Sequence, residues 1–245
     1  MESPLTSQQS GRRRRRRRAG ENSFTRSREG HQEEHWGEEI GKKKREHFRL
    51  LQLNMGTMPE HANSEEFRTL TGQLDRFQVD CVTGQELNRN WGKMREEDRL
   101  FERFRGAFEA VHINESRYRN DMFAVGSKQY GGTAVFSINS AAHRLHTEQP
   151  KDNDPLELGR WTSTRLIGKR GKGIRVVSAY RPNKNNDTGD LSVYNQHLAK
   201  LAELNDDRDP LQAFLDDLHE AITRWNDKGD VIILGIDYNG MSVTN

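Results

Sequence analysis

Near the C-terminal end of the sequence, an apolar run carries an acid and an amide to one point in the chain. Residues 230–239 read Asp-Val-Ile-Ile-Leu-Gly-Ile-Asp-Tyr-Asn, which predicts a buried strand with a polar end. In layered α/β proteins, ligands collect beyond the carboxyl ends of strands, where a rigid strand fixes its terminal side chains. The chain is therefore expected to fold around a sheet, with Asp237 and Asn239 at the edge of a site.

Three other predicted strands end in polar residues in the same way. The strand over 48–54 ends in Asn54, the strand over 79–86 ends in Glu86, and the strand over 173–180 ends in Tyr180. Taken alone, a polar residue at a strand end is more often a turn former or a cap than a functional group. The repetition at four strand ends favours a shared site.

Helix signals lie between and after these strands. Ser64 is a predicted N-cap for a helix over about 64–77, and Ser192 is one for a helix over 192–204. Asp209 followed by Pro210 predicts the start of a third long helix. Further elements are a short helix near 100–104, strands over 108–113, 131–138 and 161–167, and a hairpin turn over 168–173. This mixed order argues for a layered α/β domain rather than a simple doubly wound sheet.

Residues 1–47 differ in composition from the rest of the chain. They contain 13 Lys+Arg and 8 Asp+Glu, including the unbroken arginine run 12–18, whereas the remainder contains 26 and 29. With few aliphatic residues, this segment is expected to be a disordered basic tail, followed by one domain over 48–245. The arginine run is typical of a nuclear-import signal or a clamp on nucleic-acid phosphates, and low-complexity sequence without a role also produces such runs.

Cysteine content and hydropathy restrict the cellular compartment expected for the protein. Cys81 is the single cysteine, so no intrachain disulfide can form, which fits a reducing intracellular compartment. No apolar stretch reaches the ~20 residues that span a bilayer, and the N-terminus lacks the apolar region of a secretory signal. The oligomeric state cannot be deduced from these features.

Five stretches in order resemble the endonuclease/exonuclease/phosphatase superfamily, which has the DNase I-like fold. The Gly159-Arg160-Trp161 segment resembles the retroelement-linked branch of that superfamily. The resemblance covers residues 48–245 and implies a four-layer α-β-β-α sandwich. The matching stretches are 51–54, 84–88, 131–135, 177–182 and 233–239.

The resemblance implies a metal-dependent phosphodiesterase. Glu86 matches the family's metal-binding glutamate, and Asn54 matches the asparagine that helps to place the metal or the phosphate. The implied ion is Mg²⁺ or Mn²⁺, which suits hard oxygen ligands. Asp237 matches the aspartate that orients or deprotonates the attacking water, Asn239 the asparagine at the scissile phosphate, and Tyr180 a tyrosine near that phosphate.

The partner implied by the resemblance is nucleic acid, with DNA favoured over RNA. Arg181 and Arg160, both in matched segments, are the candidate nucleic-acid contacts. The sequence departs from the family pattern at two points. Gly56 stands where some members carry an acid, and the family's later strands with an Asp-His pair have no match before Asn245. We therefore expect the domain to be incomplete at its C-terminus.

Three functions remain open at the level of sequence. The first is an endonuclease that cleaves DNA by metal-assisted attack of water. The second is a phosphatase of inositol or lipid phosphates, because the same fold serves both substrate classes. The third is a catalytically inactive fragment or relic of a retroelement endonuclease, which is expected to be marginally stable because its sheet edges lack partners.

Overall fold

A computed structural model of the protein describes residues 40–146, 152–184 and 189–239. The arginine run and most of the predicted tail lie outside these ranges. One compact unit begins at Lys42. Within it, Lys43 Nζ lies 2.6 Å from the Asp80 carboxylate. No helix within the described ranges has the length and apolar character needed to cross a bilayer.

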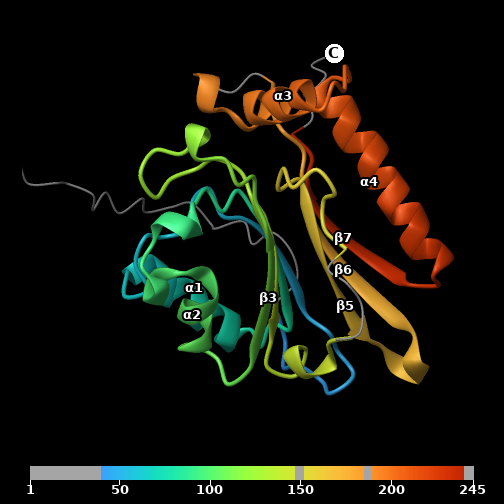
Figure 1. The fold of residues 1–245 in the computed structure, drawn as a ribbon. Helices are drawn as coiled ribbons and strands as arrows, with labels where there is room; N and C mark the ends of the chain where they lie inside the picture. The colour runs from blue at the N-terminus through green and yellow to red at the C-terminus, as the bar shows by residue number, and fades with distance from the viewer. Residues whose placement is uncertain (1–39, 147–151, 185–188, 240–245) are drawn as a thin grey trace, which may run out of the picture. The chain divides into compact units, whose positions relative to one another are not determined.

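The strands and α-helices follow the order predicted from the sequence, and most bounds agree within a few residues. In chain order they are β1 (Leu50–Asn54), α1 (Glu65–Arg76), β2 (Cys81–Gln85), α2 (Leu100–Arg105), β3 (Val111–Ser116), β4 (Thr133–Ile138), β5 (Trp161–Ile167), β6 (Gly173–Tyr180), α3 (Val193–Glu203), α4 (Pro210–Asp227) and β7 (Val231–Asp237). Figure 1 shows their arrangement.

The strands form two sheets. One has the order β1-β2-β4-β3, and the other has the order β5-β6-β7. Within them, β1 runs parallel to β2 and β6 runs parallel to β7, whereas β5 and β6 form the predicted antiparallel hairpin. The parallel pairs place Asn54 beside Gln85 and Tyr180 beside Asp237. The polar ends of each pair are therefore held at one edge of their sheet.

The two sheets pack face to face with helices on both outer sides (Figure 1). One apolar cluster joins α1 and α2 to the first sheet, and it includes Phe67, Phe104 and Phe136. A second joins α4 to the second sheet through Phe214 and Trp225. A third lies between the sheets and consists of Cys81, Val135, Ala141, Leu166 and Val176. This layering confirms the predicted four-layer α-β-β-α sandwich.

The helix starts are set by the predicted capping residues. The Ser64 side chain accepts a hydrogen bond from the Phe67 N–H, and the Ser192 side chain accepts one from the Asn195 N–H. Asp209 caps α4 by accepting from the Leu211 N–H, with Pro210 in the first turn. Each cap satisfies a donor that the helix itself cannot pair.

The two sheets approach each other closely at Gly235. A Cβ atom there would lie 2.1 Å from Thr83 Oγ1 and 2.8 Å from Thr83 Cβ. Gly235→Ala is therefore expected to destabilise the fold by about 1–3 kcal/mol through overpacking, measured by urea unfolding. In α1, a Cβ at Gly72 meets nothing within 4 Å, so the control Gly72→Ala is expected to stabilise by about 0.5–1 kcal/mol. Equal unfolding midpoints for the two variants would contradict this account of the sheet interface.

His197 on α3 is a packing residue with 1% of its surface exposed. Burial, assisted by the charge of Arg160, lowers its pKa to about 3. The unfolded chain binds a proton at this histidine near pH 6.5, so acid favours the unfolded state. The stability that neutral His197 provides is present above about pH 6.5 and is lost as the pH falls toward 3.

This loss can be isolated by substitution. His197→Leu is expected to remove part of the decline in unfolding free energy between pH 6.5 and 3, on the order of a few kcal/mol. His219→Leu, at an exposed position on α4, is the control and is expected to keep the decline. Identical pH profiles for both variants would show that His197 does not couple protonation to folding.

Candidate active site

The carboxyl ends of β1, β2, β6 and β7 meet at one end of the sandwich. Asn54 on β1 donates a hydrogen bond from Nδ2 to Asp237 Oδ2 on β7 at 2.7 Å, which joins the two sheets directly. Gln52, two residues earlier on β1, donates from Nε2 to the Ile236 carbonyl oxygen, also at 2.7 Å. These contacts fix the Asp237 carboxylate relative to the first sheet.

Tyr180 is the buried centre of this group, with 3% of its surface exposed. Its pKa is raised, first by burial and then by the charge of Glu86 and a hydrogen bond to it. The charge of Asp237 adds to the increase, while a hydrogen bond with Asn239 opposes it. Glu86, Asp237 and Asn239 therefore converge on one phenol, which stays protonated and can donate a hydrogen bond.

The backbone at Glu86 and Asn239 is unusual. Their φ angles are +52° and +44°, in the left-handed region that residues with side chains seldom adopt. Such a conformation costs on the order of 1 kcal/mol and persists only where the surroundings enforce it. Glu86 and Asn239 follow the ends of β2 and β7, where this backbone conformation changes the direction of the chain. Both side chains interact with Tyr180.

The residues present fit a hard divalent cation. Glu86 and Asp237 are half-buried carboxylates near the same phenol, and within the described ranges neither forms an ion pair with Lys or Arg. Mg²⁺ commonly takes one or two protein carboxylates and keeps water for its other positions. The described residues contain no group of three or more acidic, His or Cys side chains that could hold an ion. The two carboxylates thus offer the hard oxygen donors that Mg²⁺ and Mn²⁺ accept.

Asn54 has a different set of contacts from the one expected for a metal ligand. Its Oδ1 accepts from the Gly56 N–H at 2.8 Å, while Nδ2 is directed at Asp237. One lone pair of Oδ1 remains available. In this structure the Asn54 side chain positions Asp237 through its Nδ2 hydrogen bond. Direct metal binding by Asn54 stays a prediction.

The two predicted nucleic-acid contacts lie in different settings. Arg181 is half-buried beside the site, where its guanidinium lies 4.7 Å from the centre of the Tyr238 ring. Its Nη1 reaches the backbone carbonyls of Tyr238 and Asn239 at 3.4 and 3.5 Å, and its own carbonyl accepts from Asn239 Nδ2. Arg181 therefore braces the chain after β7, and a phosphate contact from it stays a prediction.

Arg160 does not have the position predicted for it. Its side chain is 1% exposed and forms ion pairs with Asp154 at 2.6 Å and with Asp217 at 2.8 Å. Its Nη1 also donates to the Ala213 carbonyl oxygen. The buried guanidinium therefore connects the start of β5 and the loop before it to α4. Arg160 is not available to contact nucleic acid. The Gly-Arg-Trp segment is a packing feature, since Trp161 is 0% exposed as well.

Two supporting residues were not assigned roles from the sequence. The Asn88 side chain donates to the Gly56 carbonyl and accepts from the Gly131 N–H, which ties the loops after β1 and before β4. Gln85 is buried and donates to Ser178 Oγ and to the Gly235 carbonyl across the sheets. Both lie in the matched stretch 84–88, but the contacts they make depend on residues far away in the sequence.

A cavity of about 540 Å³ opens beside Asn54. Five apolar residues line it together with polar and charged ones, among them Glu60, Glu66 and Arg89. The cavity therefore lies at the β1 end of the group formed by Asn54, Tyr180 and Asp237.

Comparison with known proteins identifies similar structures but no similar sequences. No protein-family model matches the chain, and no curated protein matches it. Solved structures that resemble it include an endonuclease/exonuclease/phosphatase family protein from Leptotrichia buccalis (17% identity, 81% of this chain and 69% of that one, TM-score 0.48). Another is the endonuclease domain of TRAS1, a telomere-specific non-LTR retrotransposon (16% identity, 80% of this chain, TM-score 0.40).

A third is the catalytic domain of Xenopus laevis APE2, with 18% identity, coverage of 78% of this chain and a TM-score of 0.45. This chain spans 60% of the length of the TRAS1 domain and 58% of the length of the APE2 domain. In structure, the chain is thus similar to proteins of the endonuclease/exonuclease/phosphatase fold.

Proposed function

We propose that the protein is a divalent-metal-dependent phosphodiester hydrolase that acts on DNA. The observation that carries this proposal is the convergence of Glu86, Asp237 and Asn239 on the buried phenol of Tyr180, with Asn54 holding Asp237 from the opposite sheet. Two carboxylates, two amides and a protonated phenol supply a proton acceptor, oxygen ligands and hydrogen-bond donors for a phosphate.

Each side chain has a role that follows from its contacts. Asp237, oriented by Asn54, accepts a proton from the attacking water. Tyr180 donates a hydrogen bond to a phosphate oxygen as negative charge develops on it, and Asn239 contributes an amide N–H at the same place. Water adds to phosphorus, one P–O bond breaks, and the departing oxygen takes a proton from solvent.

Glu86 is the principal residue that would hold Mg²⁺ or Mn²⁺, with Asn54 as a second candidate. When bound, the cation supplies positive charge that stabilises the phosphorane-like transition state and the leaving oxygen. The left-handed backbone at Glu86 supports this role, because it sets the direction in which the side chain leaves the end of β2.

The choice of DNA over phosphoinositides rests on the basic character of residues 1–47 and on the resemblance of the chain's motifs. The test is to incubate the purified full chain with Mg²⁺ and either supercoiled plasmid or phosphoinositide vesicles. Plasmid nicking that EDTA abolishes is the expected result. Phosphate release from the vesicles without nicking would replace the proposal with a lipid phosphatase, and neither activity would favour an inactive relic.

A further inference from the structure

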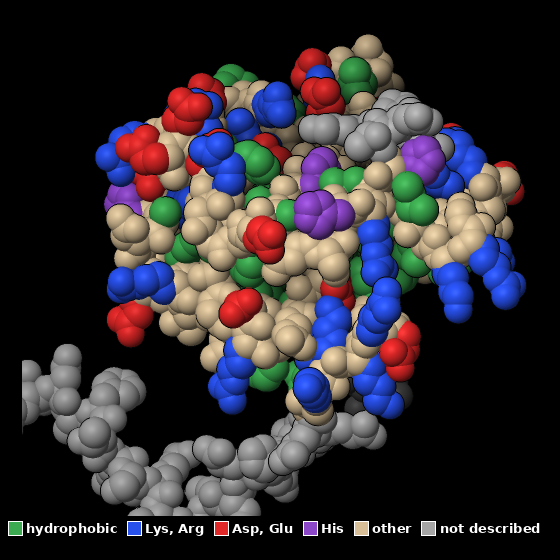
Figure 2. All heavy atoms as spheres, turned by 90° about the horizontal axis from the view of Figure 1, so that it is seen from below, with side chains coloured by type: hydrophobic (Ala, Val, Ile, Leu, Met, Phe, Trp, Pro, Cys, Tyr) green, Lys and Arg blue, Asp and Glu red, His purple; other side chains and the backbone are tan. Residues whose placement is uncertain are grey.

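The opposite end of the sandwich carries a second set of charged residues. It lies where β1 and β2 begin and β4 ends, about 17 Å from the candidate active site by the length of the five-residue strand β2. Figure 2 views this end, where Lys and Arg side chains lie beside histidines. The catalytic residues proposed above are not part of it.

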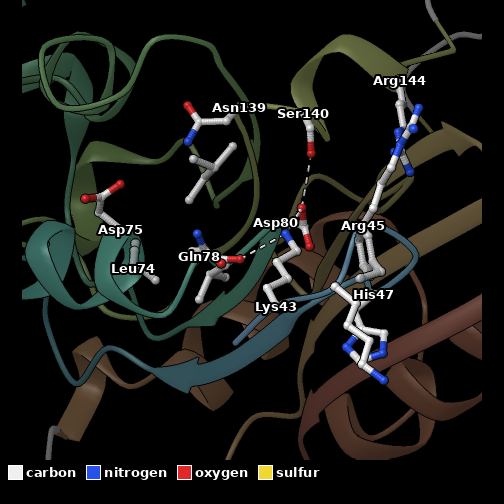
Figure 3. Close-up of a pocket in the computed structure, with 14 residues that line it drawn as sticks. Lys43, Arg45, His47, Leu74, Asp75, Gln78, Asp80, Asn139, Ser140 and Arg144 are labelled. Carbon is white, nitrogen blue, oxygen red and sulfur yellow. Dashed lines mark hydrogen bonds and ion pairs between the residues drawn. The ribbon is translucent and has the colours of Figure 1, made fainter. Parts of the chain in front are cut away.

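One cavity at this end has a volume of about 550 Å³. Figure 3 shows its interior, in which Lys43 and Ser140 both contact Asp80. Asp80 also accepts from the Arg49 backbone N–H at 2.7 Å. The Asp80 charge is thus satisfied within the fold and does not neutralise the other cations of the cavity.

A neighbouring cavity of about 810 Å³ shares Arg45, His47, Phe48 and Arg144 with the first. It adds His143 and Lys169, together with the apolar side chain of Ile167. The two cavities therefore form one extended depression from the end of α1 to the β5–β6 hairpin. We call it the basal groove and define it by Arg45, His47, His143, Arg144 and Lys169.

The cations of the basal groove outnumber the acidic side chains that line it. Within the described ranges, Arg45, Arg144 and Lys169 form no ion pair, and all three are exposed. Apart from Asp80, the acidic residues that line the two cavities are Asp75 and Glu46. Like charges gathered without partners repel one another, and an anionic ligand would relieve that repulsion.

We propose that the basal groove binds a nucleic-acid strand, as a site distinct from the proposed active site. Arg45 and Arg144 present planar donor forks that match phosphate oxygens, and Lys169 adds a further positive charge. The depression is longer than a single phosphate requires, so it suits successive phosphates of one strand. The rings of Phe48, His47 and His143 along it provide flat surfaces for bases, a combination typical of single-strand binding.

The test measures binding rather than cleavage, and it therefore does not depend on the proposed catalytic function. Fluorescein-labelled thirty-nucleotide oligodeoxythymidine is titrated with the full chain in EDTA at several salt concentrations. Arg45→Ala with Arg144→Ala is expected to weaken binding about tenfold near 0.1 M salt and to reduce the salt slope by about 1.4. Arg68→Ala with Arg99→Ala removes two exposed arginines elsewhere and is expected to leave both quantities almost unchanged.

Thermal unfolding of both double variants checks that the fold is intact. Equal affinity and equal salt slope in the two double variants would overturn the proposal. Phosphatidylserine vesicles provide a second probe. If the Arg45 and Arg144 substitutions weaken vesicle binding while oligonucleotide binding is unchanged, the groove is a membrane-surface site and the nucleic-acid assignment is wrong.

Discussion

Asp237→Asn is expected to lower the initial rate of plasmid nicking by about 10²- to 10⁴-fold. The change keeps the size of the side chain but removes the carboxylate that accepts the proton of the attacking water. Asn54 remains beside it, so the local packing is preserved.

Tyr180→Phe is expected to lower the rate of plasmid nicking by about 10²-fold, because one hydrogen-bond donor to the developing negative charge is lost.

The matched control is Asp207→Asn, which makes the same chemical change at an exposed position. It is expected to nick plasmid at the wild-type rate. Melting curves of all three variants separate a catalytic effect from unfolding. An Asp237→Asn protein that is folded and fully active would remove Asp237 from the proposed mechanism.

Arg160→Met is expected to destabilise the fold by about 3–5 kcal/mol, the typical cost of removing one partner from a buried ion pair. Asp154 would be left with its side chain 0% exposed and without its cation. Asp154 also accepts backbone hydrogen bonds from Leu156 and Leu158, so it cannot turn outward to water. Urea unfolding measures the loss.

The control for this prediction is Arg224→Ala. Arg224 pairs with Glu220 one turn away on α4 and, at 3.9 Å, with Asp152, and its side chain is 44% exposed. An exposed pair of this kind contributes about 0.3–0.5 kcal/mol. If both substitutions shift the unfolding midpoint by the same amount, the interior network does not stabilise the protein as described.

Local signals in the sequence were sufficient to predict the elements of the fold. Ser64, Ser192 and Asp209 each cap the helix predicted from them, because a cap acts within a few residues of its own position. The hairpin between β5 and β6 was recognisable for the same reason. The pairing of β1 with β2 and of β6 with β7 brings the predicted polar ends together.

Contacts between side chains that are distant in sequence could not be predicted. Arg160 looked like a surface cation, but its partners Asp154 and Asp217 lie in a loop and on a helix that only the fold brings near. Asn88 likewise contacts Gly56 and Gly131, which are far from it in sequence. The residues of the basal groove come from three separate segments, so the basic run near residue 45 alone did not indicate a cavity.

The central claim is that the ends of β1, β2, β6 and β7 form one metal-dependent hydrolytic site. Titrating Mn²⁺ into the full chain, with free ion followed by electron paramagnetic resonance, tests it most directly. We expect one binding site in the wild-type protein that is lost or strongly weakened in Glu86→Gln and kept in the exposed control Glu203→Gln. Indistinguishable Mn²⁺ titrations for wild type and Glu86→Gln would contradict the claim.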